Sequence, residues 1–146
     1  MDEDEYKSAI NILDPISETF SNIFSIQYIL GLCYSRIKMS DEAINFYNRA
    51  LIIRPNSINV LHSIAILYDD IGEWVKSDKI YDLLIKNNPN DAQAYNNYAY
   101  SLVERNKDLQ SAEYFEALYK KGEKRAKKMA RTNYVEGSGK IIPQDF

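Results

Sequence analysis

Apolar and small residues recur at three- and four-residue spacing along most of this chain, which is the spacing of one face of an α-helix. Two such runs, separated by a short break, form a unit that closes with Pro55 and a second unit that closes with Pro89. Equal steps back from these two prolines reach similar residues, such as Tyr47 and Tyr81. The pattern predicts an antiparallel helix pair that repeats at the interval from Pro55 to Pro89, a period of about 34 residues.

Other positions agree in the same register. The matching pairs are Leu30 and Ile64, Gly31 and Ala65, Tyr34 and Tyr68, Ala43 and Ser77, and Ala50 and Leu84. This pattern resembles the tetratricopeptide repeat (TPR) family, whose repeat carries a large residue, Leu-Gly, Tyr, then Ala, an aromatic residue, Ala and a closing Pro. The resemblance implies an all-α fold, a right-handed superhelical solenoid of antiparallel helix pairs in which neighbouring repeats share one core.

The register divides the chain into three repeats with a shorter segment at each end. The repeats are residues 24–57, 58–91 and 92–125, the last with a degenerate second half that lacks the closing proline. Residues 1–23 are predicted to be an N-terminal half repeat, a single helix that Pro15 kinks or shortens. A half repeat indicates a fragment of a longer TPR protein or a cap, and we expect a fragment. Residues 126–146 are predicted to be the end of a basic helix and a flexible tail.

Three residues are expected to shape the turns and crossings. Gly72 is predicted to adopt the left-handed conformation that ends the first helix of the second repeat. Asp41 is predicted to cap the second helix of the first repeat, and Gly31 to let the two helices of that repeat approach closely. The inward-facing residues are expected to be core: Gly31, Ala43, Tyr47, Ala65, Tyr81, Ala99 and Phe115.

The residues of functional interest are those that the first helices turn toward a concave groove. In the family these are the second, fifth, ninth, twelfth and thirteenth places of each repeat. The resemblance therefore implies a peptide-binding groove of Tyr28, Leu32, Arg36, Asn59, His62, Ile66, Asp69, Gln93, Asn96 and Tyr100. The same register places beside them Ser25, Ser35, Asp70, Val103 and Glu104.

Such a groove suits a short, largely apolar peptide segment. Tyrosine and leucine supply contact area, while amide side chains can hydrogen-bond an extended backbone. The alternative is that these are ordinary surface residues, or that the chain's own tail covers them. We expect a protein or peptide partner whose identity the sequence leaves open.

One ligand of the family is not expected. TPR proteins that grip the C-terminal carboxylates of the large heat-shock chaperones carry Lys and Asn in one repeat, Asn in the next, then Lys and Arg. The comparable places here hold Tyr28, Leu32, Ser63, Gln93 and Asn97. None of these is cationic, so we do not expect a chaperone carboxylate-clamp TPR.

Residues that could support catalysis are few. His62 is the only histidine and Cys33 the only cysteine, so no zinc site is predicted. Cys33 stands among apolar residues of a helix, where a buried, inert thiol is expected. The tail sequence EGSGK at residues 136–140 lacks the earlier glycine and the Ser or Thr of a phosphate-binding loop. We therefore expect no enzyme activity and no cofactor.

Charge leaves two alternatives open. The net charge is −3, yet residues 120–131 carry seven basic side chains and one acid, Glu123. This basic helix could bind an anionic surface, either nucleic acid or lipid. The acidic body would repel a polyanion, so neither nucleic acid nor a membrane is the expected partner. The second alternative is self-assembly into a homo-oligomer through exposed solenoid ends.

Location is predicted from two further features. No run of 18 apolar residues could cross a membrane, and the acidic start MDEDEYKS lacks the features of a signal peptide. We therefore expect a cytoplasmic protein, or a fragment of a larger or exported one.

Overall fold

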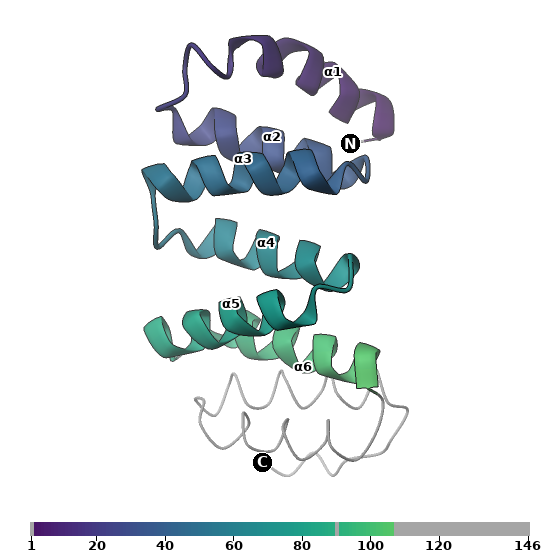
Figure 1. The fold of residues 1–146 in the computed structure, drawn as a ribbon, viewed down its shortest axis with the longest axis vertical. Coiled ribbons are helices and arrows are strands. Elements are labelled where there is room, and N and C mark those ends of the chain that lie inside the picture. Colours follow the sequence, from purple (N-terminus) through teal and green to yellow (C-terminus); the bar gives the residue numbers. More distant parts are fainter. Residues whose placement is uncertain (1, 90, 107–146) are drawn as a thin grey trace. The chain divides into compact units, whose positions relative to one another are not determined.

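The computed structural model describes residues 2–89 and 91–106, apart from the side chains at positions 92, 96, 103 and 106. Every regular element in these residues is a helix (Figure 1). Two compact units divide the chain between Glu73 and Trp74. The helices of the first are α1 (Glu3–Leu13), the short 3₁₀ helix η1 (Asp14–Ile16), α2 (Phe24–Arg36), α3 (Ser40–Ile53) and α4 (Ile58–Asp70). Those of the second are α5 (Trp74–Asn87) and α6 (Ala92–Asn106).

The helix bounds repeat with the period predicted from the sequence. Helices α2, α4 and α6 begin at even intervals along the chain, and each interval equals the step from Pro55 to Pro89. The starts of α3 and α5 are separated by the same interval. This succession of helices confirms the all-α, TPR-like helical repeat architecture. Residues 107–125 of the third repeat, the basic run 120–131 and the tail lie outside the described residues.

The turns that end α2 and α4 have the same hydrogen-bond pattern. Lys38 (φ 65°) follows α2, and Gly72 (φ 78°) follows α4. After each, the next backbone N–H donates to a carbonyl five residues earlier, that of Tyr34 at 2.9 Å and that of Tyr68 at 2.8 Å. These bonds satisfy carbonyls at the helix end, which is the purpose of a left-handed cap. The prediction for Gly72 is confirmed.

The start of α3 differs from the prediction. Helix α3 begins at Ser40 after Met39, whose side chain makes no capping hydrogen bond. Asp41 therefore lies inside the first turn, where a carboxylate still interacts favourably with the helix dipole. The prediction that Asp41 caps this helix was wrong, because the tight turn after α2 starts the next helix two residues earlier than a cap at Asp41 would require.

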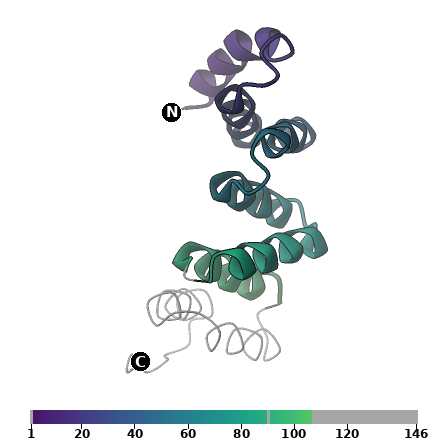
Figure 2. The same cartoon turned by 90° about the vertical axis from the view of Figure 1, so that its left-hand side faces the viewer.

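The core of the first unit forms where α2, α3 and α4 pack side by side (Figures 1 and 2). The ring of Tyr47 lies over Gly31, where a Cβ would come within 2.5 Å of the Tyr47 Cδ1 atom. This confirms that a glycine permits the close approach of α2 and α3. The predicted inward residues that the structure describes are all buried, namely Gly31, Ala43, Tyr47, Ala65, Tyr81 and Ala99, whereas Phe115 lies outside the described residues.

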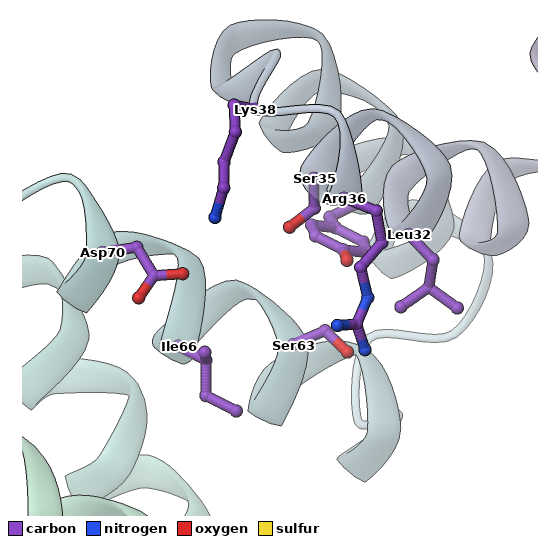
Figure 3. A pocket seen from close by; sticks show the side chains of 8 residues that line it. Leu32, Ser35, Arg36, Lys38, Ser63, Ile66 and Asp70 are labelled. Atoms are coloured by element: carbon purple, nitrogen blue, oxygen red, sulfur yellow. The ribbon is translucent and has the colours of Figure 1, made fainter. Parts of the chain in front are cut away.

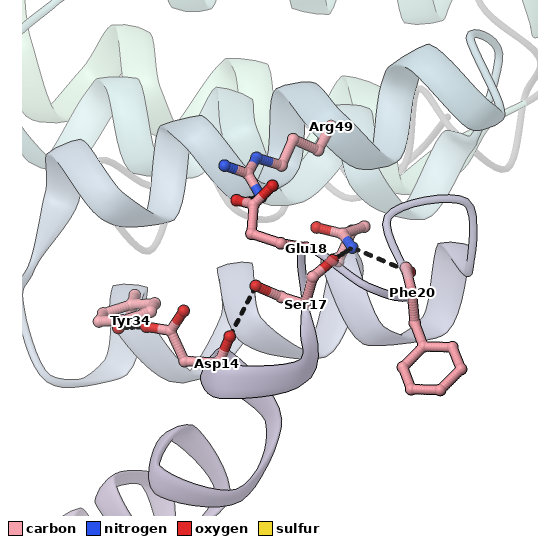
Figure 4. A network of polar contacts seen from close by, with 7 residues as sticks. Asp14, Ser17, Glu18, Phe20, Tyr34 and Arg49 are labelled. Carbon is pink, nitrogen blue, oxygen red and sulfur yellow. Dashed lines mark hydrogen bonds and ion pairs between the residues drawn. The ribbon is translucent and has the colours of Figure 1, made fainter.

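Helix α1 buries none of its side chains, and polar contacts from the residues that follow it hold it to α2 (Figure 4). As predicted for Pro15, α1 ends early, at Leu13, and a 3₁₀ turn follows. The Tyr34 hydroxyl donates to the Asp14 carboxylate. The fully buried Gln27 donates from Nε2 to the carbonyl of Ser17 at 3.2 Å. An ion pair of 2.7 Å between Arg49 and Glu18 ties the same segment to α3.

In the second unit, α5 and α6 pack through stacked tyrosines. The Tyr81 and Tyr98 ring centroids are 4.9 Å apart with an interplanar angle of 18°. The Asp91 carboxylate caps α6 by accepting from the Gln93 N–H at 3.0 Å. Arg105 pairs with Asp78 across the two helices. Within residues 2–89 and 91–106, no helix is both long and apolar enough to cross a membrane.

Candidate functional site

A pocket of about 250 Å³ lies between the C-terminal half of α2 and the facing side of α4 (Figure 3). All of its residues belong to the first unit. They are Leu32, Ser35, Arg36 and Lys38 from α2 and the turn after it, Tyr47 from α3, and Ser63, Ile66 and Asp70 from α4. The helical period explains the set on α4, since steps of three and four residues return to the same face.

One part of the lining is apolar. Leu32 is half-buried in α2, and Ile66 of α4 has 41% of its surface exposed. Tyr28, one turn before Leu32, is also half-buried. An apolar ligand that covers these side chains would be favoured by ~25 cal/mol for each Å² of apolar surface removed from water.

The floor of the pocket is a group of hydroxyls. Burial raises the pKa of Tyr47 from 10 to about 12, against the opposing effect of hydrogen bonding with Ser63 and Ser35. Its phenol therefore stays neutral at ordinary pH. The Tyr28 hydroxyl lies 3.3 Å from Ser63 Oγ, which donates to the carbonyl of Asn59 at 2.9 Å. Helices α2, α3 and α4 thus meet in one polar cluster beneath the pocket.

Three charged side chains stand around this floor. Figure 3 shows the Arg36 guanidinium reaching from α2 toward Ser63, and the Lys38 amino group extending toward the α4 side, where Asp70 lies. Arg36, Lys38 and Asp70 are all exposed to solvent. None of them forms an ion pair with another residue that the structure describes. The pocket therefore offers two cations and one carboxylate to a ligand.

The groove residues predicted for the first unit differ in where they lie relative to the pocket. Leu32, Arg36 and Ile66 line the pocket, and Tyr28 contacts its floor through Ser63. The remaining three lie elsewhere on α4: Asn59 is exposed, Asp69 is half-buried and His62 is buried with 4% exposed. The buried imidazole of His62 presents little surface to a ligand.

The predicted groove residues of the third repeat lie on α6. Gln93 is exposed, and Tyr100 has 49% of its surface exposed. The side chain of Asn96 is outside the described residues. These three belong to the second unit, and their place in a common groove with α2 and α4 stays a prediction.

Three lining residues, Lys38, Tyr47 and Ser63, are absent from the groove predicted from the sequence. The sequence places Lys38 in a turn, at the repeat position that Gly72 occupies in the next repeat. A lysine where glycine is favoured is the feature of the sequence that could have identified this residue. Tyr47 is a core residue by its register, and its ring is buried there while its hydroxyl reaches the pocket. Ser63 follows His62 directly in α4. Adjacent residues of a helix point in different directions, so Ser63 lines the pocket whereas His62 is buried.

Cys33 and groups of metal-ligating side chains are the other candidates for chemistry in the described chain. Cys33 is 3% exposed, and burial raises the pKa of its thiol, in agreement with the predicted buried residue. Among residues 2–89 and 91–106, no three His, Cys, Asp or Glu side chains are grouped to hold a metal ion. The pocket can form hydrogen bonds, ion pairs and apolar contacts, which are the interactions of a binding site.

Comparisons with known proteins agree with the helical repeat. Residues 26–57 match the family model described as tetratricopeptide repeat. The chain is 31% identical over 85 residues to "Uncharacterized protein ycf37" of Pyropia yezoensis, which is 58% of this chain and 46% of that protein. It is 27% identical over 82 residues to the protein of that name in Guillardia theta, covering 56% and 44%. The chain thus matches less than half the length of these relatives. No solved structure matches it.

Proposed function

We propose that this chain, in which residues 26–57 match the tetratricopeptide repeat model, is a non-enzymatic scaffold for protein–protein interaction. In this proposal it binds a short, largely apolar peptide segment beside α2 and α4. The observation that supports this function is the pocket between these helices. It joins exposed apolar surface to hydrogen-bonding hydroxyls on a rigid helical frame, which is the combination that peptide recognition uses.

The residues lining the pocket fit an extended peptide better than a folded surface. Leu32 and Ile66 would take an apolar side chain, and the neighbouring hydroxyls of Ser35 and Ser63 would bond polar groups of the backbone. With a volume of about 250 Å³, the pocket holds one side chain and leaves the rest of the segment on the adjoining helix surface. Affinity from one such contact is modest, and several contacts along a repeat array would raise it.

The test is selection of peptides from a phage-displayed random library on the full chain, followed by calorimetry with the synthetic peptides. Leu32→Ala and Ile66→Ala are each expected to weaken binding about tenfold, because each removes buried apolar contact. Ile52→Ala is the matched control, since Ile52 is an aliphatic residue on α3, 81% exposed and outside the pocket lining. If all three variants bind alike, the peptide site lies elsewhere.

Two further variants test the wider groove. Tyr28→Ala is expected to weaken binding through the loss of contact area next to the pocket. Tyr100→Ala should do the same only if α6 contributes to the same peptide site. Binding through apolar contacts should persist at high salt, whereas binding through residues 120–131 should fall steeply with salt and in a Lys124→Glu/Lys128→Glu variant.

Self-assembly is the second candidate, and exposed apolar side chains near the start of the chain favour it. Ile12 is 69% exposed, Phe20 43%, Ile23 40% and Ile16 37%. Such side chains could pack against a second copy. Light scattering over a range of concentrations tests this, with Ile12→Lys expected to lower the mass of any oligomer. A monomer at all concentrations excludes self-assembly.

A further inference from the structure

We infer that the partner segment presents a carboxylate to this pocket, held between Arg36 and Lys38, beside an apolar side chain on Leu32 and Ile66. The inference rests on the proposed function and names the chemistry that the site selects. A purely apolar groove would bind acidic and neutral peptides of the same shape equally, whereas this inference requires the neutral peptide to bind more weakly.

The charge pattern of the first unit sets Arg36 and Lys38 apart. Within residues 2–73 the sequence carries eleven acidic and five basic side chains. The other three basic side chains have partners: Lys7 pairs with Glu3 at 2.6 Å, Arg49 with Glu18 at 2.7 Å, and Arg54 lies 4.3 Å from the centre of the Phe24 ring. Among the described residues of this acidic unit, Arg36 and Lys38 are thus the cations with neither an ion pair nor a contact with an aromatic ring, and both lie at one pocket.

The geometry around these cations suits a carboxylate. The Arg36 guanidinium and the Lys38 ammonium approach the pocket from the α2 side (Figure 3). A guanidinium offers parallel N–H donors that match the two oxygens of a carboxylate, and an ammonium adds a point charge. The hydroxyl of Ser35 lies in the same lining and can supply a further donor, whereas the Ser63 hydroxyl already donates to the carbonyl of Asn59.

The size and the third charge restrict the ligand further. A volume of about 250 Å³ is below the range of ~300–1,000 Å³ typical of sites for whole small molecules, so one acidic side chain fits better than a larger anion. Asp70 on the α4 side would repel a second carboxylate and could accept from a peptide N–H. The expected motif is one acidic residue with an apolar neighbour.

The backbone at Lys38 gives independent support. Lys38 has φ 65°, and the same position of the next repeat is Gly72 with φ 78°. A side chain at this conformation is less favourable than glycine, and strained positions of this kind concentrate at ligand clamps. Retaining a lysine here is expected if its ammonium contributes to binding.

The experiment selects peptides on the full chain from the same random library. This library displays its peptide segments without a free C-terminus. Enriched peptides are expected to carry Asp or Glu next to an apolar residue. Calorimetry then compares each selected peptide with its Glu→Gln or Asp→Asn form, against the wild-type chain and the Arg36→Gln/Lys38→Gln variant. Arg54→Gln is the matched control, because it removes a cation from outside the pocket lining.

We expect neutralising the peptide acid to weaken binding about tenfold, with the same loss from the double variant and little further loss from both together. Arg54→Gln should bind as the wild-type chain does. Each selected peptide is also made with a free and with an amidated C-terminus. Dependence on the side chain rather than the terminus identifies an acidic residue as the source of the carboxylate, and dependence on the terminus alone overturns that assignment.

Two other outcomes separate this inference from the proposed function. Peptides that lose affinity in Leu32→Ala or Ile66→Ala, yet bind equally with their acid neutralised, would retain the groove and reject the carboxylate. Failure to enrich any peptide sensitive to the pocket variants would reject both.

Discussion

Gly31 shows at the scale of one residue how the first helix pair closes. A Cβ at this position would lie 2.5 Å from Cδ1 and 2.6 Å from Cε1 of Tyr47, closer than real contacts allow. Gly31→Ala is expected to lower the free energy of unfolding by about 1–2 kcal/mol, because the overlap outweighs the gain of ~1 kcal/mol in helix propensity. Urea unfolding measures the change. In a Tyr47→Leu background the same substitution should cost less, and an equal cost there would show that the ring is not the obstacle.

The paired cap residues Lys38 and Gly72 give a second prediction at this scale. Both have positive φ, which a residue with a Cβ adopts at a cost of ~1 kcal/mol. Lys38→Gly is therefore expected to stabilise the chain slightly, by about 0.5 kcal/mol, since the more flexible unfolded chain offsets part of the gain. Gly72→Ala should destabilise by about 1 kcal/mol. Chemical unfolding of both variants checks the opposite signs, and two changes of the same sign would contradict this account.

A gain in stability from Lys38→Gly would also bear on function. The variant removes the ammonium from the pocket, so it should bind an acidic peptide more weakly while unfolding less readily. If Lys38 had only a structural role, the substitution would change stability without weakening the binding of an acidic peptide.

Helix α1 illustrates the scale of an element that polar contacts hold in place. It buries no side chain, and the Tyr34–Asp14 hydrogen bond, the Gln27 contacts and the Glu18–Arg49 ion pair join the residues after it to α2 and α3. Exposed ion pairs stabilise little, so the hydrogen bonds of the buried side chains should dominate.

Tyr34→Phe tests this attachment. It removes the hydroxyl that donates to the Asp14 carboxylate, at an expected cost of about 1–2 kcal/mol for a hydrogen bond to a charged group. Amide hydrogen exchange should become faster in residues 3–13 than in α3, because the change loosens the docked segment first. Tyr6→Phe is the control, since it removes a tyrosine hydroxyl within α1 itself. Equal exchange in the two variants would show that the Tyr34 hydroxyl does not hold α1.

Alkaline stability is a property of the whole molecule that two buried tyrosines should control. The pKa values of Tyr34 and Tyr47 are raised from 10 to about 12, chiefly by burial, and at Tyr34 also by the hydrogen bond to Asp14. A raised folded-state pKa means that the full stability is present below pH 10 and is lost as the pH rises toward 12.

The expected loss over that range is on the order of 1–3 kcal/mol for each tyrosine. Urea unfolding at a series of pH values measures it, and tyrosinate absorbance reports the ionisation directly. Tyr47→Phe should flatten the decline, because phenylalanine has no proton to lose. A decline of unchanged steepness in that variant would assign the alkaline loss to other groups.

Much of the helix framework could be predicted from the sequence, because it depends on local spacing. The register between Pro55 and Pro89 matched Gly31 with Ala65, and the helix bounds follow it. Core positions were predictable for the same reason: a stripe of small and apolar residues at helical spacing can only be buried against a neighbouring helix. The start of α3 could not be predicted in this way, because the residue at the cap position depends on how tightly α2 and α3 are joined.

The pocket depended on tertiary structure. A sequence register assigns each residue to a face of its own helix, but a pocket forms from the facing sides of several helices and from how deep each side chain lies. Packing buried the predicted groove residue His62 and placed its neighbour Ser63 at the lining. It also brought the hydroxyl of a core residue, Tyr47, and the turn residue Lys38 to the same place. The sequence by itself thus determined the repeat, its period and its core, because these follow from spacing along one chain. Only the packing of α2, α3 and α4 decided which side chains share the pocket, because that depends on distances between residues far apart in the sequence.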